Sequence, residues 1–296
     1  MLSSLPPGIH RTLGAFSSDA RHYQLSFLFI FLLTGLFALN WSLLPWQIPL
    51  TFLVALLTQF GGIHLLKLPL HSLKSALITS FSLCLLFRSE SYAVILLATF
   101  LSIASKFVFR INGKHFFNPA NFGICATILL TGKGWISPGQ WGSEGLWLFL
   151  VGILGFLVVS RAQRLDLALS FIVGFGGAML VRMVFWQHWP LDALLHLFTS
   201  GSLLLFTFFM ITDPASTPAH KTVRICWAFA AGLLAFYLQA YQWINASPLW
   251  ALFFLSPLSP LLDHFFKGEK FRWTRPEVLS QHLSTSYPGQ GLSGTH

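Results

Sequence analysis

The sequence is poor in charge. Asp, Glu, Lys and Arg make up only 9% of the 296 residues, whereas 54% are hydrophobic and the mean hydropathy is +0.67. No water-soluble domain of this length hides that much apolar surface. The composition therefore excludes a soluble globular enzyme and predicts an all-α integral membrane protein whose solvent is lipid.

Cysteine and acidic residues are also scarce. Cys84, Cys125 and Cys226 lie far apart inside apolar runs, without the spacing of a metal or redox motif, so we interpret them as packing residues and expect no metal site. The nine acidic residues all fall in loops or at the ends of apolar runs. Their distribution argues against a proton relay made by this chain alone.

A signal peptide is lacking as well, because residues 1–22 contain no continuous apolar core. We expect 1–22 to be a cytoplasmic N-terminal segment, 23–266 to be the membrane domain, and 267–296 to be a cytoplasmic, disordered tail. The tail is too poor in apolar residues to order itself.

Long apolar runs fill the region between these ends. They predict ten transmembrane helices, of which the fifth and sixth are short and are candidates for tilted or broken helices. The ten runs are 23–43, 48–66, 72–88, 91–109, 119–131, 145–160, 165–186, 193–211, 223–242 and 247–263.

The basic residues support that count. With ten spans, 15 of the 18 Lys and Arg residues fall on one side of the membrane, as the positive-inside rule requires. This placement predicts a multi-pass protein with both termini in the cytoplasm, and it favours the lipid bilayer rather than nucleic acid as the partner of the excess positive charge. Five helices per half also permit two inverted repeats, with Asn118-Pro119 and Ser247-Pro248 as equivalent helix starts.

The most informative segment lies between the fourth and fifth spans. Asn118 is predicted to cap a helix whose positive dipole end faces Arg110, Lys114 and His115, which suggests an anion site. The alternative is a basic loop that only sets topology. A second junction, residues 212–218, offers Asp213-Pro214 and Thr217-Pro218 as further helix starts, with a plain stop and restart as its alternative.

The same segments resemble a known family, which comprises the NqrB membrane protein of the sodium-pumping NADH:quinone oxidoreductase and the RnfD membrane protein of the Rnf electron-transport complex. Two of the matching stretches are specific. The stretches are 75–79 (SALIT), 113–123 (GKHFFNPANFG), 137–142 (SPGQWG), 208–214 (FFMITDP) and 259–263 (SPLLD), of which the second and fourth are the specific ones.

The resemblance implies a ten-helix, inverted-repeat fold that holds flavin within an ion-translocating redox complex. In this family, FMN is esterified to a threonine in a Ser-Gly-Ala-Thr-type motif after the fifth helix. Residues 131–144 contain no such motif. Covalent FMN is therefore not expected, and a non-covalent flavin, FMN or riboflavin, remains. The chain is also similar to reduced, stand-alone relatives associated with enediyne-type natural-product clusters.

The resulting hypothesis is a membrane subunit of the bacterial inner membrane that takes part in flavin-linked electron transport with other membrane or redox subunits. The chain would then be at most a flavin-carrying or non-catalytic subunit of an oxidoreductase, and no catalytic residue is assigned. Arg110, Lys114, His115, Asn118 and Asp213 are the predicted cofactor-binding residues. Two alternatives without redox activity are an inverted-repeat transporter or channel, and an accessory protein of a membrane-associated biosynthetic pathway.

Overall fold

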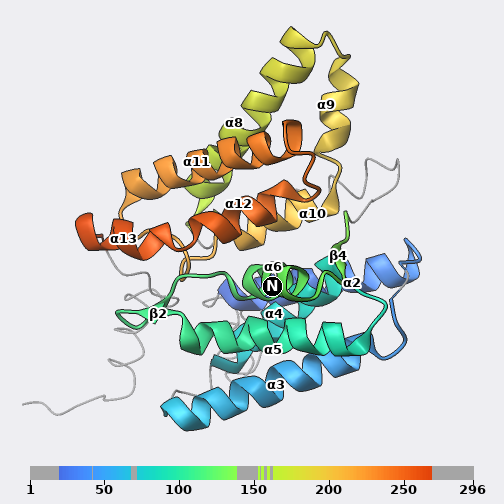
Figure 1. Ribbon diagram of the computed structural model, residues 1–296, viewed down its shortest axis with the longest axis vertical. Coiled ribbons are helices and arrows are strands. Elements are labelled where there is room, and N and C mark those ends of the chain that lie inside the picture. Colours follow the sequence, from blue (N-terminus) through green and yellow to red (C-terminus); the bar gives the residue numbers. More distant parts are fainter. Residues whose placement is uncertain are drawn as a thin grey trace, which may run out of the picture.

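A computed structural model describes residues 20–41, 43–67, 72–138, 153, 155–156, 159–160 and 163–268. The sixth expected span, 145–160, lies mostly outside these residues. The expected N-terminal segment 1–22 and the expected tail 267–296 lie almost entirely outside them. The part of the chain that the structure describes is mostly helical (Figure 1).

Within the described residues, the first half of the chain contributes five helices and a short hairpin. These elements are α2 (Ala20–Phe37), α3 (Gln47–Leu66), α4 (Leu73–Leu86), α5 (Tyr92–Val108), β2 (Arg110–Ile111), β3 (Lys114–His115) and α6 (Pro119–Thr131). Two two-residue strands, β1 (Phe87–Arg88) and β4 (Trp135–Ile136), pair antiparallel beyond the ends of α4 and α6.

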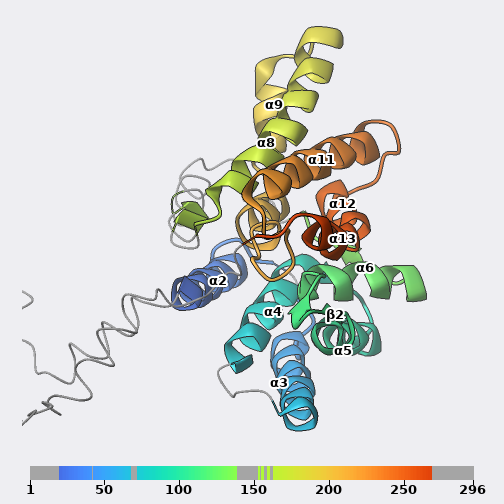
Figure 2. The ribbon, with the colours of Figure 1, turned by 90° about the vertical axis from the view of Figure 1, so that its left-hand side faces the viewer.

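Within the described residues, the second half contributes two long helices, α8 and α11, and several shorter ones. Its elements are α8 (Leu165–Leu180), η2 (Val181–Trp186), α9 (Leu191–Leu197), α10 (Gly201–Leu205), η3 (Phe206–Met210), α11 (Lys221–Ala240), α12 (Ser247–Leu255) and α13 (Leu258–Phe265). In both views α2 to α6 occupy the lower part of the molecule, and the helices from α8 onward lie above them (Figures 1 and 2).

Three of the described helices are long and apolar enough to cross a membrane: Gln47–Leu66, Leu165–Trp186 and Lys221–Ala240. Four more apolar helices are shorter, at 10–17 residues. Large apolar side chains remain exposed on the long helices, including Leu65 on α3, Val173 on α8 and Leu233 on α11. Exposed apolar faces of this extent are those of a membrane protein.

Two of the predicted spans that the structure describes are broken. The run 193–211 contains α9, a turn at residues 198–200, and then α10 continued by η3, whereas the run 247–263 is interrupted at Ser256 and Pro257. By contrast, the short fifth run is one unbroken helix, α6. The hydropathy of an apolar run does not register such a break, because turn residues inside the run can be apolar too.

Helices α8 and α11 pack closely through glycine. A Cβ atom at Gly174 would lie 2.5 Å from the carbonyl oxygen of Phe229, and one at Gly232 would lie 2.6 Å from that of Phe171. Gly174 therefore serves close helix packing, as small residues do between membrane helices. At Gly177 the space is open instead.

The two halves of the chain meet where α6 packs against α12. The side-chain amide of Asn121 donates to the carbonyl oxygen of Leu249 at 2.8 Å, and both residues are buried. One continuous core of buried side chains extends from α2, α4 and α6 to α8, η3, α11 and α12. The start of α6 is thereby held at the interface of the two halves.

Candidate functional site

A tight hairpin carries three of the predicted site residues. Strands β2 and β3 pair antiparallel, with Arg110 opposite His115 and Ile111 opposite Lys114. The turn residues Asn112 and Gly113 have φ angles of 54° and 82°. Positive φ at both turn positions is the type I′ geometry, for which Asn-Gly is the preferred sequence. The hairpin was not predicted from the sequence, although its Asn-Gly turn is a local signal.

The pairing separates the three basic residues into two groups. Directly opposite residues of a two-stranded ladder point to the same face, and neighbours along a strand point to opposite faces. Arg110 and His115 accordingly share a face and line a cavity, whereas Lys114 does not line it.

Lys114 instead contacts the second half of the chain. Its ammonium nitrogen lies 2.9 Å from Oδ2 of Asp263 on α13 and also donates to the carbonyl oxygen of Thr217. Oδ1 of Asp263 accepts a hydrogen bond of 2.7 Å from the backbone N–H of Ala219. Lys114 is thus occupied by protein partners, which gives this predicted cofactor residue a role in joining the two halves.

Helix α6 begins at Pro119, as predicted. Asn118 is its N-cap, and its side-chain oxygen accepts the backbone N–H of Asn121 at 3.2 Å. The Asn118 side-chain amide reaches the carbonyl oxygen of Met210 at 3.5 Å. The N-terminus of α6 is therefore fixed against η3, next to the second predicted junction.

Residues 212–218 form turns and not a helix start. Both predicted starts, at Pro214 and Pro218, are wrong, because α11 begins only at Lys221 with His220 as its N-cap. The prediction for Ser247-Pro248 was also wrong in detail: Ala246, with φ of 52°, is the N-cap, and Ser247 is already helical. A cap–Pro pair is common in turns as well as at helix starts, which explains both errors.

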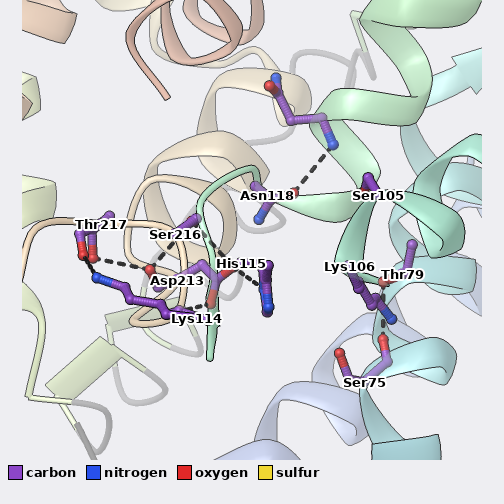
Figure 3. Close-up of polar contacts among 12 residues, drawn as sticks. Ser75, Thr79, Ser105, Lys106, Lys114, His115, Asn118, Asp213, Ser216 and Thr217 are labelled. Carbon is purple, nitrogen blue, oxygen red and sulfur yellow. Dashed lines mark hydrogen bonds and ion pairs between the residues drawn. The ribbon is translucent and has the colours of Figure 1, made fainter. Parts of the chain in front are cut away.

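Asp213 organises the loop between η3 and α11. Its carboxylate accepts the backbone N–H of Ala215 at 3.1 Å and the hydroxyl of Ser216 at 3.2 Å, and Oδ2 lies 3.9 Å from Nε2 of His115 (Figure 3). Burial alone would raise the pKa of Asp213. The nearby His115 and its charge, with the hydrogen bonds from Ala215 and Ser216, lower this pKa below the usual value instead. Asp213 is therefore an ionised carboxylate that holds His115.

These residues surround a cavity of about 310 Å³, here called the hairpin cavity. Its described lining comes from α2, α3, α4, α5, the β2–β3 hairpin, the start of α6, η3 and the loop after it. Four of the five predicted site residues line it: Arg110, His115, Asn118 and Asp213. Its volume lies at the lower end of the range for small-molecule pockets.

Several lining residues were not predicted from the sequence. Arg21, Gln59 and Lys106 all face the hairpin cavity. In the sequence, Lys106 counts only among the 15 basic residues that the positive-inside rule places on one side of the membrane, although its place inside the apolar run 91–109 was a signal that it is buried. Ser75 and Thr79 also line the cavity, and both lie in the SALIT stretch. Figure 3 shows Lys106 beside Thr79, on the other side of the site from Asp213.

A second cavity of about 580 Å³, here called the far cavity, lies beyond the other end of α6. It is lined by Trp135 and Ile136 of β4 and by the start of α12, with Trp250 and Phe175 among its aromatic residues. No charged residue occurs in its described lining. The two cavities therefore differ in charge although each lies against a helix start.

Fold and site define an α-helical membrane protein with a small-molecule-sized cavity where its two halves meet. Residues 128–272 match the model of the NQR2, RnfD, RnfE family. The family resemblance found in the sequence is confirmed for this part of the chain, which includes Asp213 and Asp263 but not the hairpin or Asn118.

Individual relatives agree with that match. The chain is 31% identical over 137 residues to the RnfD protein of the ion-translocating oxidoreductase complex of Yersinia pestis, covering 46% of this chain and 36% of that protein. The corresponding protein of Klebsiella pneumoniae is 28% identical over 150 residues, covering 51% and 38%. That of Pseudomonas paraeruginosa is 25% identical over 142 residues, covering 46% and 40%. The matched part thus spans 40% or less of the length of these relatives.

Proposed function

We propose that this protein is a membrane subunit of an ion-translocating oxidoreductase complex and takes part in flavin-linked electron transport. The observation that carries the proposal is the match of residues 128–272 to the family, together with relatives named as RnfD proteins of such complexes. Other membrane or redox subunits of the bacterial inner membrane are then its partners. The ten spans, their two inverted sets of five and the cytoplasmic termini are part of the same proposal.

The hairpin cavity is the proposed place of a non-covalent flavin. Its described lining combines apolar side chains for a planar ring, such as Phe107 and Phe208, with polar groups for its edges, such as Asn118 and Thr79. A flavin supplies electron-transfer chemistry that side chains lack. In this proposal Asn118 and His115 orient the ring edge, and Asp213 holds His115 in place.

Covalent FMN is not part of the proposal, since no attachment motif occurs in residues 131–144. Purification from cells supplied with riboflavin, followed by visible absorbance and in-gel fluorescence after denaturation, tests both points. We expect a flavin spectrum in the native protein and no fluorescent band after denaturation. A preparation that carries no flavin, even after addition of FMN and riboflavin, would overturn the cofactor proposal.

Site variants sharpen the test. Asp213→Asn removes the charge that holds His115, so it should lower the bound flavin severalfold relative to the protein. Asp192→Asn is the matched control, because Asp192 lies on α9 outside the cavity lining and its carboxylate contacts only its own neighbour Ala193 among the described residues. An equal flavin content in the two variants would show that Asp213 does not contribute to flavin binding.

The role in a complex needs its own experiment. The tagged chain, expressed in its native host, should co-purify from solubilised membranes with further redox subunits, and the complex should reduce an acceptor in a flavin-dependent manner. Recovery of the chain alone, with undiminished stability and flavin content, would contradict membership of a complex.

A transporter is the second candidate, and one observation favours it. The hairpin cavity and the far cavity lie against the starts of α6 and α12, the two helix starts that the inverted-repeat hypothesis treats as equivalent. In transporters built from inverted repeats, the substrate and ion sites lie at the interface of the repeats, against the ends of discontinuous helices. The test compares the flux of a candidate anion into liposomes that contain the protein with its flux into empty vesicles. Equal rates would exclude that anion as a transported solute.

A further inference from the structure

The lining of the hairpin cavity contains a buried lysine. Lys106 is 6% exposed, and its ammonium donates to Oε1 of Gln59 at 3.2 Å. Gln59 is in turn fixed by a hydrogen bond to Ser72. Among the described residues no carboxylate forms a salt bridge with Lys106. A buried ammonium with one amide partner is unfavourable unless a further acceptor or an anion compensates it.

The rest of the described lining is positive as well. Lys106 and Arg110 contribute two basic side chains, and Asp213 is the one carboxylate among the described lining residues. That carboxylate is already engaged by His115, Ser216 and the backbone of Ala215. A concave site with an excess of one sign concentrates ligands of the opposite charge.

The backbone adds to this field. The 13-residue helix α6 begins at the cavity, and Asn118, Pro119 and Ala120 all line it. The N-terminus of a helix carries partial positive charge and exposed N–H groups. The far cavity, which lies at the other end of α6, has no charged residue in its described lining. The far cavity also lies against a helix start, that of α12, but without charged side chains among the described residues. The combination of a helix start with basic side chains is therefore specific to the hairpin cavity.

We infer that the hairpin cavity binds the phosphate of a soluble phosphomonoester and that Lys106 determines this specificity. An arginine fork, a lysine point charge and a helix N-terminus together are the usual components of a phosphate site. For the identity of the rest of the ligand this inference rests on the proposed function. In that context it assigns FMN, and not riboflavin, to the cavity.

Lys106 acts here as a specificity-determining residue. Its ammonium has three donors, and Gln59 uses one of them. Among the described residues Gln59 is the only hydrogen-bond acceptor of this ammonium, which leaves donors for phosphate oxygens that would also compensate the buried charge. A hydroxyl group in place of the phosphate offers neither the charge nor the number of acceptors.

The test is a titration of the purified full chain with FMN and with riboflavin, followed by quenching of flavin fluorescence. We expect FMN to bind at least about tenfold more tightly than riboflavin, in line with the strength of charged hydrogen bonds. Inorganic phosphate should compete with FMN. Lys106→Met should abolish the preference, and Lys106→Arg should restore most of it.

Two further variants keep the test decisive. Lys133→Gln removes the same charge beyond the other end of α6, outside the described lining of the hairpin cavity, and should keep the preference. If Lys106→Met fails to give a monodisperse protein, Arg110→Gln on the partly exposed hairpin takes its place and should reduce the preference severalfold.

The outcomes separate this inference from the proposed function. Equal affinity for FMN and riboflavin overturns the inference and leaves a flavin protein. Phosphate binding that depends on Lys106, without binding of either flavin, supports the inference and overturns the flavin proposal. Binding of neither phosphate nor flavin overturns both. In phosphatidylcholine nanodiscs, competition by added phosphatidylglycerol would assign the phosphate group to a lipid and overturn a soluble ligand.

Discussion

The ammonium of Lys114 lies 2.9 Å from the carboxylate of Asp263, although 149 residues separate them in the chain. The pair joins the β2–β3 hairpin of the first half to α13 of the second half. Asp263 also accepts the backbone N–H of Ala219, so one carboxylate connects three segments. The hairpin that carries Arg110 and His115 is therefore positioned from its other face by the second half of the chain.

A double-mutant cycle on Lys114 and Asp263 measures this connection. Because both side chains are partly buried, we expect a coupling free energy of about 1 kcal/mol, at the upper end for ion pairs near a surface. Lys114→Ala, Asp263→Ala and the double variant are compared by unfolding in detergent. Losses that add without coupling would show that the pair contributes nothing to stability.

Asn118 is predicted to stabilise the start of α6. Asn118→Ala removes the acceptor of the Asn121 N–H and should lower the free energy of unfolding by about 1 kcal/mol. Asn118→Ser keeps an N-cap acceptor and should lose much less. The measurement is the denaturant midpoint of both variants in detergent, and equal losses would mean that the bond to Met210, and not the cap, is what matters.

These residues illustrate what the sequence could predict. The cap at Asn118 was correct because an N-cap followed by proline is a local pattern, with donor and acceptor three residues apart. The contact between Lys114 and Asp263 depends on the packing of two halves, and no local pattern encodes it. The Asn-Gly turn could have predicted that Arg110 and His115 lie opposite each other, since a two-residue turn fixes the register of the strands that it joins.

The remaining errors have a similar origin. Hydropathy located most of the helices but not the breaks at residues 198–200 and at Ser256, because a break in an apolar run changes backbone dihedrals without changing polarity. Lys106 was not predicted as a site residue for a related reason: its charge marks a membrane side, while its burial depends on Gln59 of another helix.

Asp213 makes stability depend on pH in a defined window. Its pKa in the folded protein lies below the usual value of 3.8, so the unfolded chain binds a proton more readily near that pH. The contribution of Asp213 is complete above about pH 5 and is lost as the pH falls through about 4 and below. The wild type should therefore lose more stability between about pH 5 and about pH 3 than Asp213→Asn.

The control for this experiment is Asp192→Asn. Asp192 is on α9 and takes no part in the Asp213–His115 contact, so its variant should keep the pH dependence of the wild type. Thermal unfolding in detergent at each pH gives the comparison. Parallel curves for the wild type and Asp213→Asn would contradict a lowered pKa at this carboxylate.

Gly174 and Gly177 provide a matched pair within α8. A methyl group at Gly174 would meet the Phe229 carbonyl oxygen at 2.5 Å, whereas none of the neighbouring atoms lies within 4 Å of one at Gly177. Gly174→Ala forces α8 and α11 apart and should cost about 2 kcal/mol, as overpacking does. Gly177→Ala should be neutral or stabilising by up to about 1 kcal/mol, because alanine is the better helix former.

Unfolding of both variants in detergent, under identical conditions, distinguishes the effect of α8–α11 packing from the effect of helix propensity. If the two substitutions change stability equally, the close approach of α8 to α11 does not limit the size of residue 174. If only Gly174→Ala is destabilising, and Gly174→Ser is destabilising too, the backbone contact with Phe229 is the cause, because both replacements place a Cβ atom at the same point.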